Sequence, residues 1–357
     1  MSSIAQVDKN LQVATEIKED DIAFFDVRSE VFRIHGLCDD KVGEQFRRIP
    51  EPIAKSTSEG VYLLHTNTAG GRVRFQTNSN YIALHTKMPN VTRLSHMTLA
   101  GTSGFDLYIN KNGKSIYYKT FMPPTNMQDG YESIIYFDSN EMKDITIYFP
   151  LYNDVSSLFI GIQKDSSLVQ SNGYKFQKPV VYYGSSITQG GCASRPGNSY
   201  SAILSRLLDC DFINMGFSGN GKAEEAIVEY MSDLEMSVFV CDYDHNAPNV
   251  EYLEATHSKM YHKIREKQST LPILFLSKPD YDNGIQNSIQ RRDVIYQTYI
   301  NALKSGDKHV YFIDGYSLFG GMGRDSCTVD GCHPNDLGFM RMAEALYEPL
   351  SLIFSAI

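Results

Sequence analysis

Residues 180–191 read VVYYGSSITQGG, and they bring an apolar run to an abrupt stop at Gly184, Ser185 and Ser186. Four apolar residues in succession are typical of a strand that is buried on both faces of a parallel sheet. Glycine and serine directly after such a strand indicate one of two things. They form a tight turn, or they present a hydroxyl at the strand's carboxyl end, where open parallel sheets bind their ligands.

The second half of the chain alternates short apolar runs with helical patterns. Five such runs follow one another: residues 179–183, 212–215, 238–241, 272–276 and 310–314. Between the runs, apolar residues recur every three or four positions, as on one face of a helix. Strands that alternate with helices predict a three-layer α/β domain with a parallel sheet, and we place it at residues 176–357.

The first half of the chain instead has the pattern of short strands separated by turns. Residues 71–77 (GRVRFQT) and 145–150 (ITIYFP) alternate polar and apolar side chains, as half-buried strands do. Turn-forming pairs such as Asn112-Gly113 lie between such stretches. This spacing predicts an antiparallel, jelly-roll-like β-sandwich over residues 1–175. We expect its many tyrosines and phenylalanines to fill the interface between sheets, with a sugar-binding surface as the alternative.

Composition argues against several classes of function. The formal net charge of −9, without a long lysine or arginine run, argues against a nucleic-acid partner. No apolar run reaches the roughly 18 residues that cross a membrane, so we expect no membrane partner. The N-terminal residues lack the charged and apolar regions of a signal peptide. We therefore expect a cytoplasmic protein, or a secreted one if a signal has been removed.

The six cysteines form no CxxC pair, which favours reduced thiols over a disulfide framework. Cys327, Cys332 and His333 lie close together in sequence, but no second ligand pair matches the spacing of known zinc sites. We therefore expect no metal site.

Chemically active residues follow the predicted strands at their carboxyl ends, which lie along one edge of a parallel sheet. Ser186 follows the first strand, the glycine-rich residues 216–221 follow the second, and Asn246 follows the third. Asp330 and His333 come after the fifth strand. A serine, amide donors, a histidine and a carboxylate on one edge are the components of an acyl-transfer site.

Each residue type suits one role in that chemistry. His333 is the candidate base that takes the proton of Ser186, and Asp330 orients the imidazole from its other nitrogen. The oxyanion needs fixed donors, for which the N–H of Ser186, the N–H of Gly219 and the side-chain amide of Asn246 are the candidates. We expect glycine at 219 because a Cβ there would crowd the acyl group.

These residues resemble the four sequence blocks of the SGNH (GDSL-like) hydrolase superfamily. The matching segments are Gly-Ser-Ser186-Ile-Thr, the loop Gly-Phe-Ser-Gly219-Asn-Gly, Asn246 and Asp330-x-x-His333. The resemblance implies the same roles for Ser186, His333 and Asp330 as a triad and for Gly219 and Asn246 as oxyanion donors. Two positions depart from the pattern, since Ser185 replaces the usual Asp and Asn246 lies in Asp-His-Asn-Ala.

Residues 104–108, Gly-Phe-Asp-Leu-Tyr, fit the GxDLY pattern of the β-rich domain that precedes the catalytic domain in a subgroup of bacterial SGNH esterases. The two resemblances imply a serine esterase that removes O-acetyl or other short acyl groups from carbohydrate, such as plant-derived oligosaccharides, through an acyl-serine. They imply an acylated carbohydrate as partner and neither a metal nor an organic cofactor, and they leave the oligomeric state open. We expect Arg195, Tyr243 and His245 to line the sugar site.

Several alternatives stay open. The ester could belong to a lipid or to another non-carbohydrate small molecule, and the reaction could be acyl transfer. Gly216 to Lys222 nearly form a phosphate loop, although Ala223 stands where that motif needs Ser or Thr. Ser218 is a rival nucleophile, but its surroundings lack the last glycine of GxSxG. A lectin whose triad is catalytically inactive is a further alternative.

Overall fold

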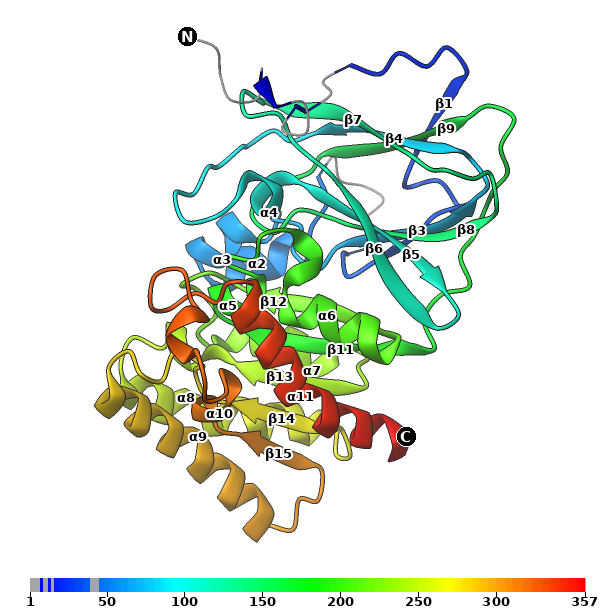
Figure 1. Cartoon of the computed structure of the whole chain (residues 1–357). Coiled ribbons are helices and arrows are strands. Elements are labelled where there is room, and N and C mark those ends of the chain that lie inside the picture. The colour runs from blue at the N-terminus through cyan, green and yellow to red at the C-terminus, as the bar shows by residue number, and fades with distance from the viewer. Residues whose placement is uncertain (1–6, 9–11, 14–15, 39–44, 357) are drawn as a thin grey trace.

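The computed structural model describes residues 7–8, 12–13, 16–38 and 45–356, arranged as two stacked bodies (Figure 1). The first half of the chain forms antiparallel sheets, and the second half forms a parallel sheet covered by helices. The predicted fold class is therefore confirmed. The exact boundary between residues 175 and 176 stays a prediction, although the first parallel strand begins at Phe176.

Two antiparallel sheets pack face to face in the first half. One has the order β1-β9-β4-β7, and the other has the order β10-β3-β8-β5-β6, with β2 paired to β3. The strands are β1 (Ile22–Asp26), β2 (Arg33–His35), β3 (Arg72–Thr77), β4 (Tyr81–Lys87), β5 (Phe105–Lys111), β6 (Lys114–Phe121), β7 (Gly130–Tyr136), β8 (Lys143–Tyr148), β9 (Ser157–Gln163) and β10 (Leu168–Val169). Alternate residues of facing strands, such as Val73 and Phe75 in β3 and Ile82 and Leu84 in β4, are fully buried in one core. The period-two pattern of the sequence places them there.

The parallel sheet has the strand order β12-β11-β13-β14-β15. Its strands are β11 (Phe176–Gly184), β12 (Cys210–Gly216), β13 (Val238–Asp242), β14 (Ile273–Leu276) and β15 (Val310–Ile313). Val180 and Tyr182 of β11 join the core on one face of the sheet, and Val181 and Tyr183 join the core on the other face. Both faces are covered, which explains why β11 has an unbroken apolar run.

Helices from the second half cover both faces of the parallel sheet (Figure 1). Those of eight or more residues are α6 (Tyr200–Leu208), α7 (Glu225–Asp233), α8 (Val250–Lys267), α9 (Ile285–Lys304) and α11 (Asp336–Ala356). α6 and α11 share a core with one face, while α7, α8 and α9 share a core with the other. Short helices lie in the connections: α2 (Glu51–Thr57), α3 (Glu59–Leu64), α4 (Leu99–Ser103), α5 (Ser186–Gln189), η2 (Pro196–Asn198), η3 (Tyr243–Asn246), α10 (Gly315–Leu318) and η4 (Arg324–Ser326). Among the described helices, none has the length and apolar character that a membrane span requires.

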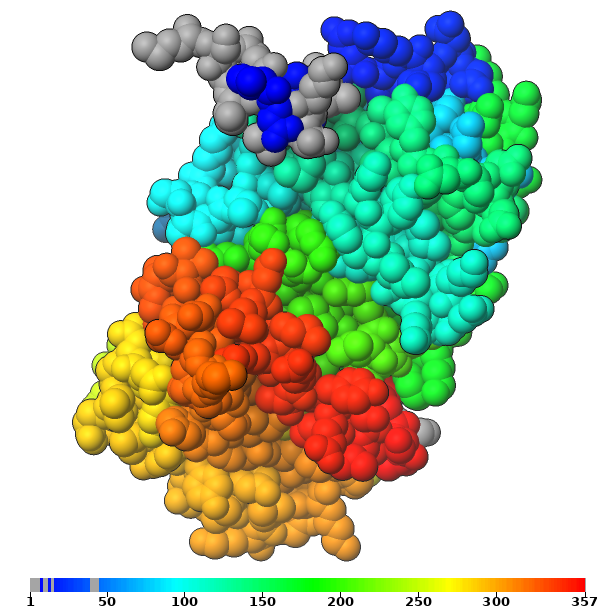
Figure 2. All heavy atoms as spheres, viewed as in Figure 1, coloured from blue at the N-terminus to red at the C-terminus, as the bar shows by residue number. Residues whose placement is uncertain are grey.

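The GxDLY segment joins the two bodies. Asp106 of β5 has no exposed surface, and its Oδ2 accepts hydrogen bonds from the Arg195 guanidinium at 2.9 Å and from the Gly197 N–H at 2.8 Å. The Tyr108 hydroxyl lies 2.5 Å from the same guanidinium, which also stacks on Tyr117 at 3.8 Å. Figure 2 shows the β5–β6 hairpin reaching over the second half of the chain at this contact. The motif is therefore an anchor between the bodies.

Candidate active site

The turn that carries Ser185 and Ser186 begins where β11 ends. Gly184 is required there, because an added Cβ would lie 1.6 Å from Oδ1 of Asp242. The Ser185 hydroxyl accepts the N–H of Ile187 at 3.1 Å and so caps α5. Ser186 thereby becomes the first residue of a helix, with its N–H free of an intrahelical acceptor.

Ser186, His333 and Asp330 form a hydrogen-bonded chain. Ser186 Oγ lies 2.9 Å from His333 Nε2, and His333 Nδ1 lies 2.8 Å from Asp330 Oδ2. The second oxygen of Asp330 accepts the backbone N–H groups of Cys332 and His333 at 3.0 and 2.8 Å. The structure thus brings together the three residues that the sequence predicted as a triad.

The charge of Asp330 is set by these contacts. Burial disfavours its carboxylate, but the hydrogen bonds from the His333 N–H and ring and from the Cys332 N–H outweigh that cost and lower its pKa to about 2. Because the pKa is lowered, the carboxylate form is favoured in the fold, and its stabilising effect is lost only as the pH falls towards 2.

The glycine-rich loop and Asn246 lie at the ends of the two strands that flank β11. Asn246 Nδ2 donates to the Phe217 carbonyl at 2.9 Å, which accepts the N–H groups of Asn220 and Gly221 as well. Gly219 has a φ of +68°, and an added Cβ would meet nothing within 4 Å. The left-handed backbone is by itself a reason for glycine at 219. The expected crowding of the acyl group by a Cβ stays a prediction.

The structure shows three further residues at the site that no sequence motif indicated. Asp242 is buried and accepts hydrogen bonds from Thr188, Tyr200 and the Ser185 N–H, so it holds the turn that carries Ser185 and Ser186. The other two residues, Gln189 and Tyr152, connect the turn to the first half of the chain. A lone acid, amide or phenol carries no recognisable signal, because its partners come from distant segments.

Gln189 has no exposed surface, and it bridges three segments. Its amide nitrogen donates to Asn67 Oδ1 at 3.3 Å and to the Leu151 carbonyl at 3.2 Å, while its oxygen accepts the Ser218 N–H at 3.0 Å. Tyr152 donates its hydroxyl hydrogen to the Ser186 carbonyl at 3.3 Å. The first half of the chain thus helps to hold both Ser186 and the glycine-rich loop.

His96, also from the first half, lies beside the triad. Its ring centroid is 5.4 Å from that of His333. The site is therefore bordered by both bodies of the molecule.

One of the predicted sugar-site residues is buried in the core. Tyr243 is only 1% exposed and shares a hydrogen bond with Thr256 at 2.8 Å, so the expectation that it contacts a sugar is wrong. The guanidinium of Arg195 pairs with Asp106 and Tyr108 between the two bodies, and its contact with a sugar stays a prediction. Each environment is created by segments far away in the sequence.

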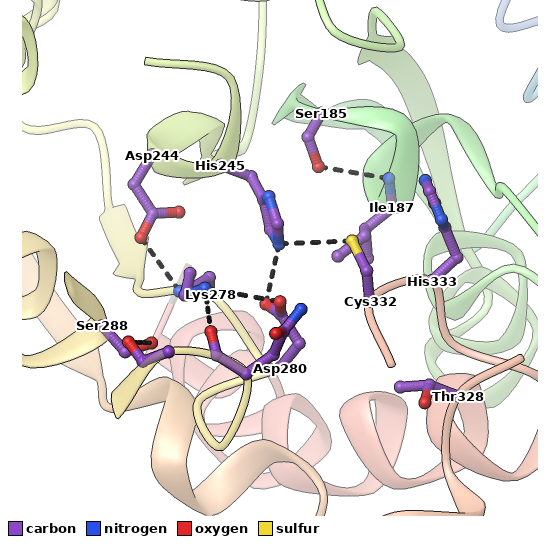
Figure 3. Close-up of polar contacts among 12 residues, drawn as sticks. Ser185, Ile187, Asp244, His245, Lys278, Asp280, Ser288, Thr328, Cys332 and His333 are labelled. Carbon is purple, nitrogen blue, oxygen red and sulfur yellow. Dashed lines mark hydrogen bonds and ion pairs between the residues drawn. The ribbon is translucent and has the colours of Figure 1, made fainter. Parts of the chain in front are cut away.

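His245 lies at the sheet edge near the triad, and Figure 3 shows Cys332 between His245 and His333. Its Nε2 is 2.7 Å from Asp280 Oδ1 and 3.6 Å from Cys332 Sγ. Burial alone would lower the pKa of His245, but hydrogen bonding to Asp280 and Cys332 raises it to about 10. The raised pKa favours the charged form of His245, which suits it to binding a polar group.

The loop that resembles a phosphate loop is occupied by protein contacts. Gly221 packs against the Gly184 carbonyl, which an added Cβ would approach to 2.5 Å. The Lys222 N–H donates to the Glu224 carboxylate at 3.0 Å. A carboxylate placed at the end of this loop would repel a phosphate.

Several groups of described residues bring potential metal ligands together. They are His96, Cys192 and His333; His245, Asp280 and Cys332; and Asp330, Cys332 and His333. Cys327, which the sequence had grouped with Cys332 and His333, is not a member of these groups. It is fully buried, with Sγ facing the Phe319 and Gly323 carbonyls.

Comparisons with known proteins identify a family for each half of the chain. A family model described as GDSL-like lipase/acylhydrolase matches residues 177–351, and one described as the GxDLY N-terminus of SGNH-hydrolase-type esterases matches residues 22–168. No curated protein is significantly similar in sequence.

Several solved structures are also similar to this chain along most of its length. A candidate GDSL-like lipase from Bacteroides ovatus is 30% identical over 94% of this chain and 98% of its own, with a TM-score of 0.84. A salicylyl-acyltransferase from a tetracycline biosynthetic pathway is 16% identical over 94% of this chain and 98% of its own, with a TM-score of 0.76. A family two carbohydrate esterase from Clostridium thermocellum, solved with cellohexaose, is 14% identical over 82% of this chain and 95% of its own, with a TM-score of 0.60.

Proposed function

Because the chain belongs to the GDSL-like lipase/acylhydrolase family and is thus an ester hydrolase of the SGNH type, we propose that it removes acetyl or other short acyl groups from carbohydrate hydroxyls. The observation that carries the proposal is the hydrogen-bonded chain from Ser186 Oγ through His333 to Asp330. A serine with a base at 2.9 Å, whose other nitrogen is held by a carboxylate, has the arrangement of an activated nucleophile.

In the first step, His333 Nε2 takes the hydroxyl proton while Ser186 Oγ attacks the acyl carbon. Negative charge develops on the carbonyl oxygen, and the N–H groups of Ser186 and Gly219 and the amide of Asn246 stabilise it. The C–O bond to the sugar then breaks, and the sugar oxygen takes the proton from His333. The products are a free sugar hydroxyl and an acyl-serine.

The second step reverses these roles with water as the nucleophile. His333 removes a proton from water, which attacks the acyl-serine, and the same donors stabilise the second oxyanion. His333 returns its proton to Ser186 Oγ as the acid leaves. Asp330, with a pKa of about 2, keeps its charge throughout and stabilises the imidazolium in both steps.

Two observations support carbohydrate as the leaving group. His96 and His245 place imidazole groups beside His333 and Cys332, and Tyr152 places a phenol at the Ser186 carbonyl. Such groups bind hydroxyl-rich molecules by hydrogen bonds. Carbohydrate esterases of family two share the fold, including one solved with an oligosaccharide. Plant-derived oligosaccharides with O-acetyl groups are the substrates that we propose to test first.

The test is acetate release by the full chain from acetylated xylo-, manno- and pectic oligosaccharides, with product NMR to identify the deacetylated position. We expect release from at least one sugar class, and none from the Ser186→Ala variant. Aryl acetate and aryl palmitate serve as comparison substrates. Hydrolysis of palmitate alone, or acetyl transfer to an added alcohol without hydrolysis of any sugar ester, would contradict the proposal in favour of a lipid ester or an acyltransferase.

Replacing Asp330 with asparagine is expected to reduce kcat by about 10²- to 10⁴-fold. The amide oxygen can still accept the N–H groups that Asp330 Oδ1 binds, so the loop keeps its shape. The amide nitrogen, however, faces His333 Nδ1 and favours the tautomer with hydrogen on Nε2, which cannot accept the proton of Ser186.

Hydrolysis of aryl acetate between pH 5 and 9 measures this effect. Because the pKa of Asp330 is about 2, its carboxylate stays charged across this range, so titration of Asp330 itself should not change the deficit. A kcat of the variant within threefold of that of the natural enzyme at every pH would show that Asp330 is not the orienting carboxylate.

A further inference from the structure

Three potential metal ligands meet beside the triad without belonging to it. His245 lies in η3 after β13, Asp280 in the loop after β14, and Cys332 in the loop before α11. One ligand atom from each lies within 4.8 Å of the others. Figure 3 shows the three side chains pointing toward one another. We call this set the His245 cluster.

The spacing of the His245 cluster suits one tetrahedral ion. Zinc bonds of about 2.0–2.3 Å to nitrogen, oxygen and sulfur place tetrahedral ligands roughly 3.3–3.7 Å apart. The distance from His245 Nε2 to Cys332 Sγ is already 3.6 Å. The distance from Nε2 to Asp280 Oδ1 is 2.7 Å and would need to widen by about half an ångström.

The three ligand atoms face one another rather than separate partners. The single hydrogen that Nε2 of His245 can carry faces two acceptors, Asp280 Oδ1 and Cys332 Sγ. A cation in their midst would satisfy all three atoms at once. Binding would release the Nε2 proton and the thiol proton, as metal binding to histidine and cysteine does.

We propose that the His245 cluster binds one divalent transition-metal ion, with Zn²⁺ as the best match to a set of one imidazole, one carboxylate and one thiolate. Zinc accepts this mixture of ligands, whereas Mg²⁺ and Ca²⁺ select oxygen alone. Three protein ligands leave a fourth position for water. The proton-transfer and covalent steps of ester hydrolysis use neither His245 nor Cys332, although His245 also borders the proposed sugar site.

Lys278 holds the carboxylate in position for such an ion. Its Nζ lies 3.4 Å from Asp280 Oδ2 and 3.3 Å from the Asn283 carbonyl. Lys278 therefore binds one carboxylate oxygen of Asp280, while the other oxygen, Oδ1, faces His245. This partner orients Asp280 from outside the site. Its positive charge also weakens ion binding, so we expect an affinity below that of closed four-ligand zinc sites.

An ion here would tie three loops together at the edge of the sheet. Cys332 lies between Asp330 and His333, and His245 directly precedes Asn246. The loop that carries the base would thus be joined to the loop that carries the amide donor. The expected result is a stabilised fold, with the midpoint of thermal unfolding raised by ~3 °C at a hundredfold excess over Kd.

The test uses metal-free full-length protein titrated with Zn²⁺ and, separately, Co²⁺. We expect one ion per chain, a rise in thermal midpoint, and with Co²⁺ the near-ultraviolet charge-transfer band of a thiolate ligand. Cys332→Ser should abolish that band, and His245→Gln and Asp280→Asn should each weaken binding at least tenfold. Circular dichroism verifies that the variants fold, and the band in the unmodified protein tests thiolate ligation without any substitution.

His96→Gln is the matched control, because His96 belongs to a different group of potential ligands around His333. It should leave Zn²⁺ affinity unchanged. Binding that survives His245→Gln but is lost in His96→Gln would place the ion on His333 and overturn the proposal. Absence of binding at 100 µM metal, or a Co²⁺ spectrum without the thiolate band, would overturn it as well. None of these results bears on ester hydrolysis, which is assayed separately.

Discussion

The Ser186→Ala variant should retain its fold and lose turnover of an aryl acetate by about 10⁴- to 10⁶-fold. Removing Oγ deletes the atom that lies 2.9 Å from His333 Nε2, and no other change in the chain follows from it. Donors at the oxyanion position would remain, so the residual rate should still exceed that of the uncatalysed reaction. A loss smaller than tenfold would show that another group attacks the ester.

Ser185→Ala is the matched control for this experiment. The Ser185 hydroxyl caps α5 through the Ile187 N–H, so its removal should cost about 1 kcal/mol of stability and leave turnover within several-fold of the natural enzyme. Initial rates and thermal midpoints for the two variants separate the roles. If Ser185→Ala were inactive and Ser186→Ala active, the nucleophile would be the neighbouring serine.

The Asp106→Ala variant should lower the free energy of unfolding by about 3 kcal/mol, a large fraction of the total for most proteins. Asp106 is fully buried, and its loss leaves Arg195 and the Gly197 N–H without their acceptor between the two bodies. Thermal unfolding and urea denaturation measure the change. A second variant, Arg195→Met combined with Asp106→Ala, should recover part of the loss, because it removes the unpaired charge.

Glu132→Ala provides the matched control on the same half of the chain. Glu132 pairs with His85 at 2.8 Å, but their side chains are 38% and 41% exposed, so this pair should contribute less than 1 kcal/mol. Equal effects of Asp106→Ala and Glu132→Ala would mean that the GxDLY segment is not an anchor between the bodies.

Much of the fold could be predicted because its signals are local. The unbroken apolar run of β11 reflects burial on both faces, and the period-two pattern of β3 reflects one buried face. The convergence of Ser186, Asn246 and the glycine-rich loop follows from the rule that parallel strands end along one edge. His333 and Asp330, three residues apart, reach the same edge.

The remaining features depend on packing between distant segments, which no local pattern records. Tyr243 follows a strand as a ligand-binding residue would, yet the core beneath α8 buries it. Arg195 lies close to Ser186 in sequence, but its guanidinium pairs with Asp106 of the other body. Gln189 carries no motif, because its acceptors are Asn67 and the Leu151 carbonyl of the other body.

This bridge by Gln189 has a consequence for how such chains can evolve. A β-sandwich that supplies hydrogen-bond acceptors to the interior of the α/β domain cannot be exchanged independently of that domain. Recombination that replaced the sandwich would have to preserve the groups at 67 and 151, or alter position 189 in the same event. The two halves should therefore be inherited as one unit, with substitutions at positions 67 and 189 coupled across lineages.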